Sequence, residues 1–223
     1  MKIIILENGP YNVDGDIPLK EVITVGNDAC KPDGYKDGKS FDKTEHSKYL
    51  CRCGHSGNMP FCDGQHNSIG FDGTETDNRK KYDDEAELVE GPVYDCLDNP
   101  KFCSGARFCS RDRGFWDAFE NAHIKECQEY VEEIGCTCDS GRLTLLDKNG
   151  TKIEPDIDKE IYLIKDELVK HLGPIQVRGG IQIIAADGFA YEIRNRVTLC
   201  RCGASQNKPF CDGAHLKCEC MEI

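Results

Sequence analysis

The sequence has few of the residues that build a large core or cross a membrane. Only 39% of its 223 residues are hydrophobic and 8% are aromatic, so we expect a thin apolar core. No apolar run has the length of a membrane-spanning helix. The apolar segment near the N-terminus, Ile3 to Leu6, is too short for the hydrophobic part of a secretion signal. We therefore expect a cytoplasmic protein with no membrane partner.

Positive charge is also scarce. The chain has 28 Lys and Arg residues against 40 Asp and Glu residues, a formal net charge of −12. This charge opposes binding to the phosphates of nucleic acids and anionic lipids, so no nucleic-acid partner is expected. A negative surface can instead attract a basic protein, as in a transient encounter between electron carriers. The alternative is that the charge only keeps the protein in solution.

The sequence contains no G-x-G-x-x-G and no phosphate-binding loop. Gly179-Gly180 is interpreted as a turn. We therefore do not expect an enzyme that binds a nucleotide cofactor itself, although the chain is compatible with one subunit of a redox enzyme whose flavin lies elsewhere.

Cysteine, in contrast, is abundant, with 15 residues. In a reducing compartment clustered cysteines more often bind metals than form disulfides. The segment CRCGHSGNMPFCDGQH returns 149 residues later as CRCGASQNKPFCDGAH, and the copies agree at twelve of sixteen positions. The repeat predicts one metal pocket built twice. Its candidate ligands are Cys51, Cys53, Cys62 and His66 in the first copy and Cys200, Cys202, Cys211 and His215 in the second.

The spacing predicts how the ligands are shared. Cys51 and Cys53 are two residues apart, close enough to hold one metal ion from a tight loop. Asp63 is a good helix cap, and a helix starting there places Cys62 and His66 on one side. Two irons with two ligands each are therefore expected in each copy. The alternative is a pair of structural Cys3His zinc sites, although such sites usually begin with C-x2-4-C rather than C-x-C.

Both copies match the pattern C-x-C-x2-S-x3-P-x-C-D-G-x-H in full, and this pattern resembles the CDGSH iron–sulfur family, also called NEET proteins. The resemblance implies a [2Fe–2S] cluster in each copy, two in all, held by three Cys and one His under a β-rich cap. Because a neutral imidazole in place of one thiolate makes such a site easier to reduce, we expect electron transfer with a redox protein such as a flavoprotein. The alternative is storage, sensing or transfer of clusters to an apo iron–sulfur acceptor.

The two copies also differ. The run from Arg194 to Leu199 before the second copy looks like the multidomain prokaryotic members of that family, whereas the first copy departs from them with Lys48-Tyr49-Leu50. Met59 in the first copy is replaced by Lys208 in the second. A different charge near each histidine predicts unequal potentials or stabilities for the two clusters.

The repeat extends beyond the ligands. Gly9 to Leu19 resembles Gly173 to Ile183, and each reads as strand, glycine turn, strand. We predict a β-hairpin before each metal loop and a monomer whose halves bury each other's strands around an internal pseudo-twofold axis. The first copy carries an insertion, Asp28 to Lys43, that is rich in Gly, Lys and Asp and is expected to be an exposed loop.

The middle of the chain has its own pattern. From Phe115 to Ile134 apolar residues recur at spacings of three and four, which predicts an amphipathic helix that ends at Gly135. The turn residues Asp147 to Gly150 predict a hairpin between 142–146 and 151–153.

Together these features predict an α+β protein in which two CDGSH units form an intrachain pseudo-dimer around a small ferredoxin-like α+β insertion. The predicted segments are a first unit (1–73), a charged linker (74–92), a central cysteine-rich segment (93–158) and a second unit (159–223).

The central segment contains Cys103 and Cys109, spaced C-x5-C, and Cys136 and Cys138 after the predicted helix. It resembles a divergent single-cluster ferredoxin-type domain, although Asp139 stands where that family has proline and the C-x2-C-x2-C of ordinary ferredoxins is absent. The resemblance implies a third cluster, [4Fe–4S] or [3Fe–4S], on these four cysteines. The alternative is that several of them are packed thiols.

The remaining cysteines carry weaker signals. Cys127 lies on the apolar side of the predicted helix and is expected in the core, while Cys30 and Cys96 have no spacing partner. Cys218 and Cys220 are expected in a solvated tail; the alternative is that they bind metal adventitiously.

Overall fold

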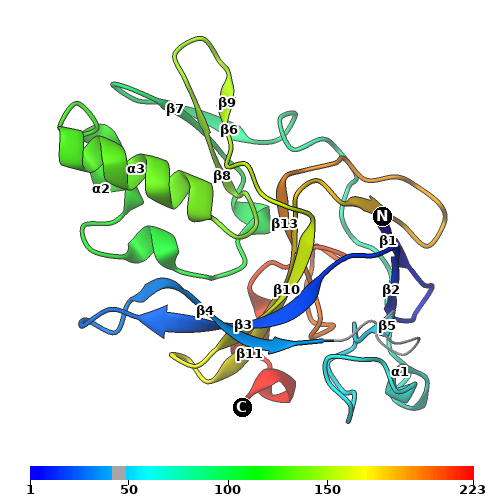
Figure 1. Cartoon of the computed structure of the whole chain (residues 1–223). Helices are drawn as coiled ribbons and strands as arrows, with labels where there is room; N and C mark the ends of the chain where they lie inside the picture. Colours follow the sequence, from blue (N-terminus) through cyan, green and yellow to red (C-terminus); the bar gives the residue numbers. More distant parts are fainter. Residues whose placement is uncertain (42–48) are drawn as a thin grey trace.

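A computed structural model describes residues 1–41 and 49–223 of the chain and arranges them in three sheets with short helices around them (Figure 1). The first sheet has the strand order β12-β1-β2-β5. Its strands are β1 (Lys2–Ile5), β2 (Tyr11–Asp14), β5 (Tyr49–Leu50) and β12 (Gln182–Ile184).

The second sheet has the order β13-β11-β10-β3-β4. It contains strands from the N-terminal and the C-terminal half of the chain, so the two halves share one sheet. Its strands are β3 (Leu19–Gly26), β4 (Pro32–Ser40), β10 (Glu160–Asp166), β11 (His171–Arg178) and β13 (Arg196–Leu199).

The two sheets are related by an internal pseudo-twofold axis. In the first half β1, β2 and β5 form an antiparallel set, and in the second half β10, β11 and β13 repeat it. Each half then sends its next strand across: β3 pairs in parallel with β10, and β12 pairs in parallel with β1. The predicted α+β fold class, with two halves that bury each other's strands, is confirmed.

The expected local hairpins are wrong in one respect. β2 and β3 lie in different sheets, and so do β11 and β12, so the glycine turns carry the chain from one half to the other. Gly15 has φ of +103° at the first turn, a conformation that residues with a side chain rarely adopt. Exchange between halves lets each strand bury its apolar side in a shared core, which a local hairpin of two short strands cannot do.

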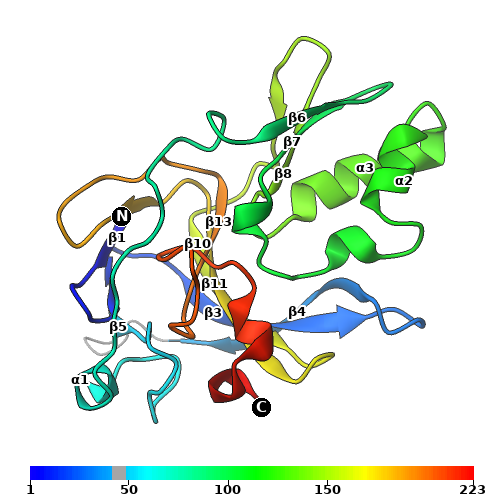
Figure 2. The same ribbon diagram turned by 180° about the vertical axis from the view of Figure 1, so that it is seen from behind.

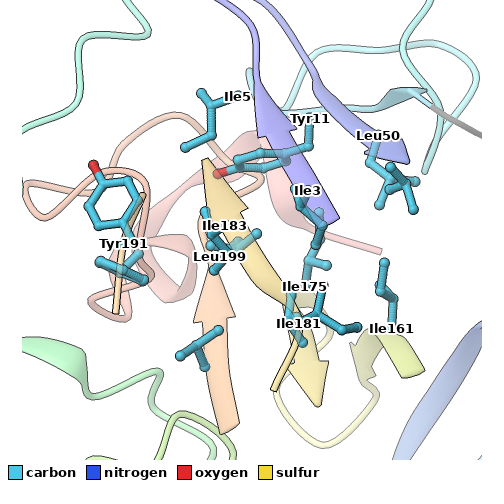
Figure 3. Close-up of a cluster of buried hydrophobic side chains, with 14 of the residues drawn as sticks. Ile3, Ile5, Tyr11, Leu50, Ile161, Ile175, Ile181, Ile183, Tyr191 and Leu199 are labelled. Atoms are coloured by element: carbon cyan, nitrogen blue, oxygen red, sulfur yellow. The ribbon is translucent and has the colours of Figure 1, made fainter. Parts of the chain in front are cut away.

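The shared core lies between these two sheets, and Figure 3 shows side chains from both ends of the chain meeting there. Ile3, Tyr11 and Leu50 of the first half are completely buried, as is Leu199 of the second. Apolar packing of this kind supplies most of the stability of a small fold. The other labelled members are Ile5, Ile161, Ile175, Ile181, Ile183 and Tyr191.

The insertion expected as a loop contains a strand instead. β4 pairs antiparallel with β3 along the edge of the second sheet, and most of its residues are exposed. Tyr35 anchors it, because its ring packs edge-on against Phe108 at 5.2 Å and its hydroxyl donates to Asp139 at 2.6 Å. The end of the insertion (42–43) and Lys48 lie outside the described residues.

The central segment forms a lobe at the upper left of Figure 1. Its sheet has the order β6-β7-β8-β9, and the predicted hairpin is confirmed as the β8–β9 pair. Strand β6 lies within the range expected to be a linker. The elements are β6 (Glu87–Glu90), β7 (Asp95–Asp98), β8 (Leu143–Leu146), β9 (Lys152–Ile153), α2 (Phe115–Glu120) and α3 (Lys125–Thr137).

Two helices replace the single predicted one. The chain leaves helical geometry at Asn121 (φ −102°, ψ 19°) and α3 then continues through Gly135 to Thr137. Gly135 therefore does not end the helix. A Cβ built there would lie 2.6 Å from Leu145 Cδ1, so the glycine allows close packing of α3 on β8. Cys127 is buried in this core as expected.

Several one-turn helices complete the fold, and no helix among the described residues is both long and apolar enough to cross a membrane.

The expected solvated tail is wrong: Met221 is fully buried and the Ile223 amide donates to the carbonyl of Lys170. Figure 2 shows this C-terminal segment beneath the second sheet. The short helices are α1 (Gln65–Ser68), η2 (Pro100–Phe102), η3 (Phe108–Ser110), η4 (Ala214–Lys217) and η5 (Glu219–Met221).

Candidate metal centres

Each repeated motif begins where a short buried strand ends. Leu50 at the end of β5 is bridged to Phe61, and Leu199 at the end of β13 is bridged to Phe210. In both copies the next amide, that of the first cysteine, donates to a proline carbonyl at 2.8 Å. The apolar pair and this hydrogen bond close the loop so that its two ends lie side by side.

The first two thiols of each motif lie close together. The Sγ atoms of Cys51 and Cys53 are 3.7 Å apart, and those of Cys200 and Cys202 are 3.6 Å apart. Two thiolates held at about 2.3 Å by one tetrahedral metal lie about 3.8 Å apart. The C-x-C segment therefore already has the spacing of two ligands on one metal.

The other two donors of each motif form a second pair. Sγ of Cys62 lies 3.3 Å from Nδ1 of His66, and Sγ of Cys211 lies 3.4 Å from Nδ1 of His215. Within residues 1–41 and 49–223, no group of three or more His, Cys, Asp or Glu side chains is placed to hold a single ion. The donors of each motif are thus arranged two by two.

The aspartate of each motif shapes the loop that carries the second pair. Asp63 accepts hydrogen bonds from the amides of Gln65 (3.0 Å) and Gly57 (2.8 Å), and Asp212 makes the equivalent bonds in the second copy. The helical turn begins at residue 65 or 214 rather than at the aspartate. The aspartate therefore fixes the loop instead of binding metal.

The two motifs meet at the pseudo-twofold axis. Cys53 and Cys202 form an isolated antiparallel bridge. The following glycines let the backbones approach: a Cβ built at Gly54 would lie 2.9 Å from the Cys202 carbonyl oxygen, and one at Gly203 would lie 3.1 Å from that of Cys53. Both glycines have positive φ. The two candidate centres are therefore neighbours across a single backbone contact.

Sequence reasoning missed the arginine inside each C-R-C. Arg52 and Arg201 are 2% and 4% exposed. Arg52 donates to the carbonyls of Leu6, Gly9 and Gly73. The identical arginine in both copies was the available signal, because such a repeat at a buried position indicates a structural role.

Arg201 makes the equivalent contacts, donating to Gly173 at 2.6 Å and to Ile164. Burial lowers the pKa of Arg201 to about 10, so it stays charged at neutral pH. Each arginine ties its loop to neighbouring backbone, and Arg201 places a positive charge near the thiols of Cys51, Cys202 and Cys211.

The two centres differ in burial. Cys62 and His66 are half-buried, whereas Cys211 and His215 are 2% and 4% exposed. Burial lowers the pKa of His215 to about 4, and the charges of Arg201 and His171 add to this effect. Neutral imidazole is the form that binds metal, so the fold holds His215 ready for ligation.

Burial also acts on the thiols. It raises the pKa of Cys53 to about 11 and that of Cys211 well above the usual value. A hydrogen bond from Cys202 lowers the pKa of Cys200 to about 6. Most of these thiols are protonated at neutral pH without metal, so metal binding must release protons.

Lys208, expected to place a charge near the second histidine, holds that charge within the loop of the second motif. Its Nζ donates to the carbonyls of Gly203 (3.3 Å) and Ser205 (3.0 Å) within its own loop. The structure also separates the two centres by burial, since Cys211 and His215 are buried and Cys62 and His66 are half-buried.

The central cysteines divide into two groups. Cys103, Cys109 and Cys138 line one small cavity. Cys136 instead lines a separate cavity of about 320 Å³ beside Arg196. Cys136 belongs to the last turn of α3, whereas Cys138 follows the helix with non-helical geometry (φ −59°, ψ 109°). The structure thus brings three of the four predicted thiols together.

The fold and the two loops define a β-rich protein with a duplicated Cys and His loop, a candidate metal site in each half. The family model described as "Iron-binding zinc finger CDGSH type" matches residues 8–67 and 172–216. The chain therefore contains two CDGSH domains, one in each matched region, and domains of this family bind [2Fe–2S] clusters. No curated protein and no solved structure matches the chain.

Proposed function

We propose that this protein is an electron carrier with two [2Fe–2S] clusters, one in each motif. Cys51, Cys53, Cys62 and His66 would hold the first. The observation that carries the proposal is the two-by-two arrangement of donors, with spacings of 3.7 and 3.3 Å inside the pairs. The second cluster would be held by Cys200, Cys202, Cys211 and His215.

The same arrangement disfavours structural zinc. A Cys3His zinc site requires four donors around one ion, and no three donors converge on one point among the described residues. Two pairs, each spaced for one tetrahedral metal, match the demands of a binuclear iron–sulfur centre.

The chain's own groups suit reversible one-electron chemistry, which a bound cluster supplies. One imidazole in place of a thiolate removes a negative charge beside the metal, which favours the reduced state. The buried guanidinium groups of Arg52 and Arg201 add positive charge near the sulfurs. The Cys53–Cys202 bridge offers a short route for an electron between the two centres.

The partner we propose is a basic redox protein such as a flavoprotein. The net charge of −12 produces an attraction that increases the encounter rate and weakens with salt. An electron can pass through a half-buried ligand during a brief contact between the two proteins. The half-buried side chain of His66 offers such a contact.

We further propose a third cluster at the three central thiols. Ala106 lines the same cavity and lies three residues from both Cys103 and Cys109, where the C-x2-C-x2-C run of ordinary ferredoxins has its middle cysteine. Arg142 also lines the cavity and is held by Asp98 at 2.7 and 2.9 Å. Three thiols and one alanine favour [3Fe–4S] over a fully ligated [4Fe–4S].

This third site adjoins the second motif. A Cβ built at Gly213 would lie 3.3 Å from the Cys103 carbonyl oxygen, and one at Gly105 would lie 2.7 Å from Leu216. Electrons would therefore pass between the central site, the second motif and the first motif in that order.

A second candidate function is transfer of the first cluster to an apo-protein. Its support is the exposure of Cys62 and His66, because an acceptor's thiols can reach this pair, while the equivalent pair in the second motif is buried. If the protein transfers its first cluster, one cluster per chain is lost to the acceptor. If it carries electrons, the clusters are reduced reversibly and the iron stays bound.

The test of the proposed function is to measure iron and acid-labile sulfide per chain after purification without oxygen, with electron paramagnetic resonance of the reduced protein. About four irons indicate two binuclear clusters, and about seven indicate the third site as well. Zinc without sulfide would refute the proposal.

A further inference from the structure

The C-terminal cysteines Cys218 and Cys220 are joined in a disulfide that lies against the second metal loop. Both are half-buried and pack against Cys200, Cys202 and Met221. Sγ of Cys220 lies 3.9 Å from the carbonyl oxygen of Cys202. The disulfide is therefore in direct contact with a residue that serves as a ligand in the proposed function.

The same sulfur also adjoins the first metal loop. A Cβ built at Gly54 would lie 3.0 Å from Sγ of Cys220. Gly54 follows Cys53, which is bridged to Cys202 across the pseudo-twofold axis. Cys220 thus lies at the junction of the two loops, beside a proposed ligand of each cluster.

The fold does not require sulfur at this position. Five residues after the ligand histidine, the second half has Cys220 and the first half has Phe71. Phe71 occupies the equivalent place, because a Cβ built at Gly203 would lie 3.0 Å from its Cε2 atom. An aromatic ring therefore fills in one half the space that the disulfide fills in the other.

A structural staple is also a weak explanation for the pair. The stabilisation that a disulfide gives increases with the length of the loop it closes, and only Glu219 separates these cysteines. The segment has other anchors, since Met221 is fully buried and Glu222 is bridged to His171.

We propose that Cys218 and Cys220 form a redox-active pair that exchanges two electrons with the two metal centres. This inference rests on the proposed function. On reduction the S–S bond breaks, the pair takes up two electrons and two protons from solvent, and two thiols form. Each binuclear centre holds one electron, so the two reduced centres together supply both electrons and are themselves oxidised.

The first test observes the thiols directly. The oxidised holoprotein is incubated without oxygen with photoreduced flavin, alkylated, and cleaved after Lys217, which releases a peptide, 218–223, whose only cysteines are the pair. We expect no label before reduction and two labels afterwards. A peptide that stays unlabelled while the clusters are reduced would overturn the proposal, and so would two labels in the oxidised protein.

The second test counts electrons. We expect about four per chain for the two clusters and the pair, and about two for Cys218→Ser, which leaves Cys220 in its packed position. A third cluster would add equally to both counts. Cys30→Ser, at an exposed cysteine, is the matched control and should behave like the unaltered protein.

The route of the electrons is tested with Cys211→Ser, which removes a ligand of the second centre. The rate at which the same flavin reduces the pair, measured by alkylation of the thiols that form, should fall at least tenfold in this variant. Equal electron uptake by Cys218→Ser and the unaltered protein, with both cluster signals intact, would refute the redox pair alone. Absence of iron and sulfide would refute the proposed function instead, so the two failures are distinguishable.

Discussion

The hydroxyl of Tyr11 donates a hydrogen bond to the backbone carbonyl of Cys200 at 2.6 Å, joining residues 189 positions apart in the chain. The ring of the same tyrosine lies 5.6 Å from the guanidinium carbon of Arg52. One side chain from the first half thus supports the C-R-C segment of both motifs. The equivalent position in the second half is Ile175, so the support is not symmetric.

Tyr11→Phe should weaken the second centre more than the first. The ring stays beside Arg52, but the carbonyl of Cys200 loses its buried donor, which costs about 1–3 kcal/mol. We expect the free energy of unfolding to fall by that amount and the second cluster to be lost faster, as measured by urea unfolding and by the decay of each cluster's spectrum.

The matched control is Tyr191→Phe, which keeps the ring packed against Phe210 and removes a hydroxyl that donates to Glu75 at 2.6 Å rather than to a carbonyl of a metal loop. It should lower stability without distinguishing the two clusters. Equal cluster loss in both variants would contradict the role given to Tyr11.

Gly54→Ala tests the contact between the motifs. The new Cβ would lie 2.9 Å from the Cys202 carbonyl oxygen and 3.0 Å from Sγ of Cys220, so the backbones must separate. Gly64→Ala is the control, because Gly64 has φ of +89° against +82° for Gly54 but no atom within 4 Å of a built Cβ.

Both substitutions carry the cost of a positive φ, about 1–2 kcal/mol, and Gly54→Ala should cost about 1–3 kcal/mol more through overpacking. Denaturant unfolding of the holoprotein measures the difference. Equal destabilisation would mean that the motifs do not pack as closely as described.

The sequence could predict the features of this molecule that depend on residues close together in the chain. The ligand pairs are separated by two or four residues, so local geometry alone brings Cys51 to Cys53 and Cys62 to His66. The parallel partner of β3 is β10, which pairs Ile161 with Leu19, and no local spacing indicates a partner so far along the chain. Local reasoning therefore predicted hairpins where the strands exchange between halves.

The same limit applies to the central cysteines. Cys136 and Cys138 look equivalent in sequence, but Cys136 lies in the last turn of α3, Cys138 follows it, and the two line different cavities. Where a helix ends depends on packing against β8, in particular the contact that Gly135 makes possible with Leu145. No spacing rule contains that information.

The two clusters should differ in acid stability. The folded pKa of His215 is about 4, below the usual value of about 6.5, so a proton competes poorly with iron for this nitrogen. In the metal-free chain the unfolded state binds this proton first, so stability falls as pH decreases from about 6.5 to about 4. His66 is half-buried, so its ring is in contact with solvent.

Single-cluster variants make the comparison clear. Cys211→Ser should retain only the first cluster and Cys62→Ser only the second. We expect the second cluster to survive to a pH lower by about one unit, measured by visible absorbance during acid titration. The same midpoint in both variants, or the opposite order, would contradict the argument from burial.

The central site offers the most specific prediction. Ala106→Cys places a fourth thiol where ordinary ferredoxins have one, in a cavity already lined by Cys103, Cys109 and Cys138. We expect iron per chain to increase by about one and the resonance of an oxidised trinuclear cluster to disappear, because a tetranuclear cluster replaces it. Ala106→Ser, similar in size but without a soft ligand, should leave both unchanged.

Cys136 provides the companion test. Because it lines the other cavity, Cys136→Ser should leave the iron content unaltered, whereas Cys138→Ser should remove the central cluster, about three irons, and keep the four of the two motifs. Loss of the central cluster in Cys136→Ser would show that the end of α3 rearranges to make four thiols available. Unchanged iron in Cys138→Ser would mean that the three thiols are packed residues of the core and that the chain carries electrons with two clusters only.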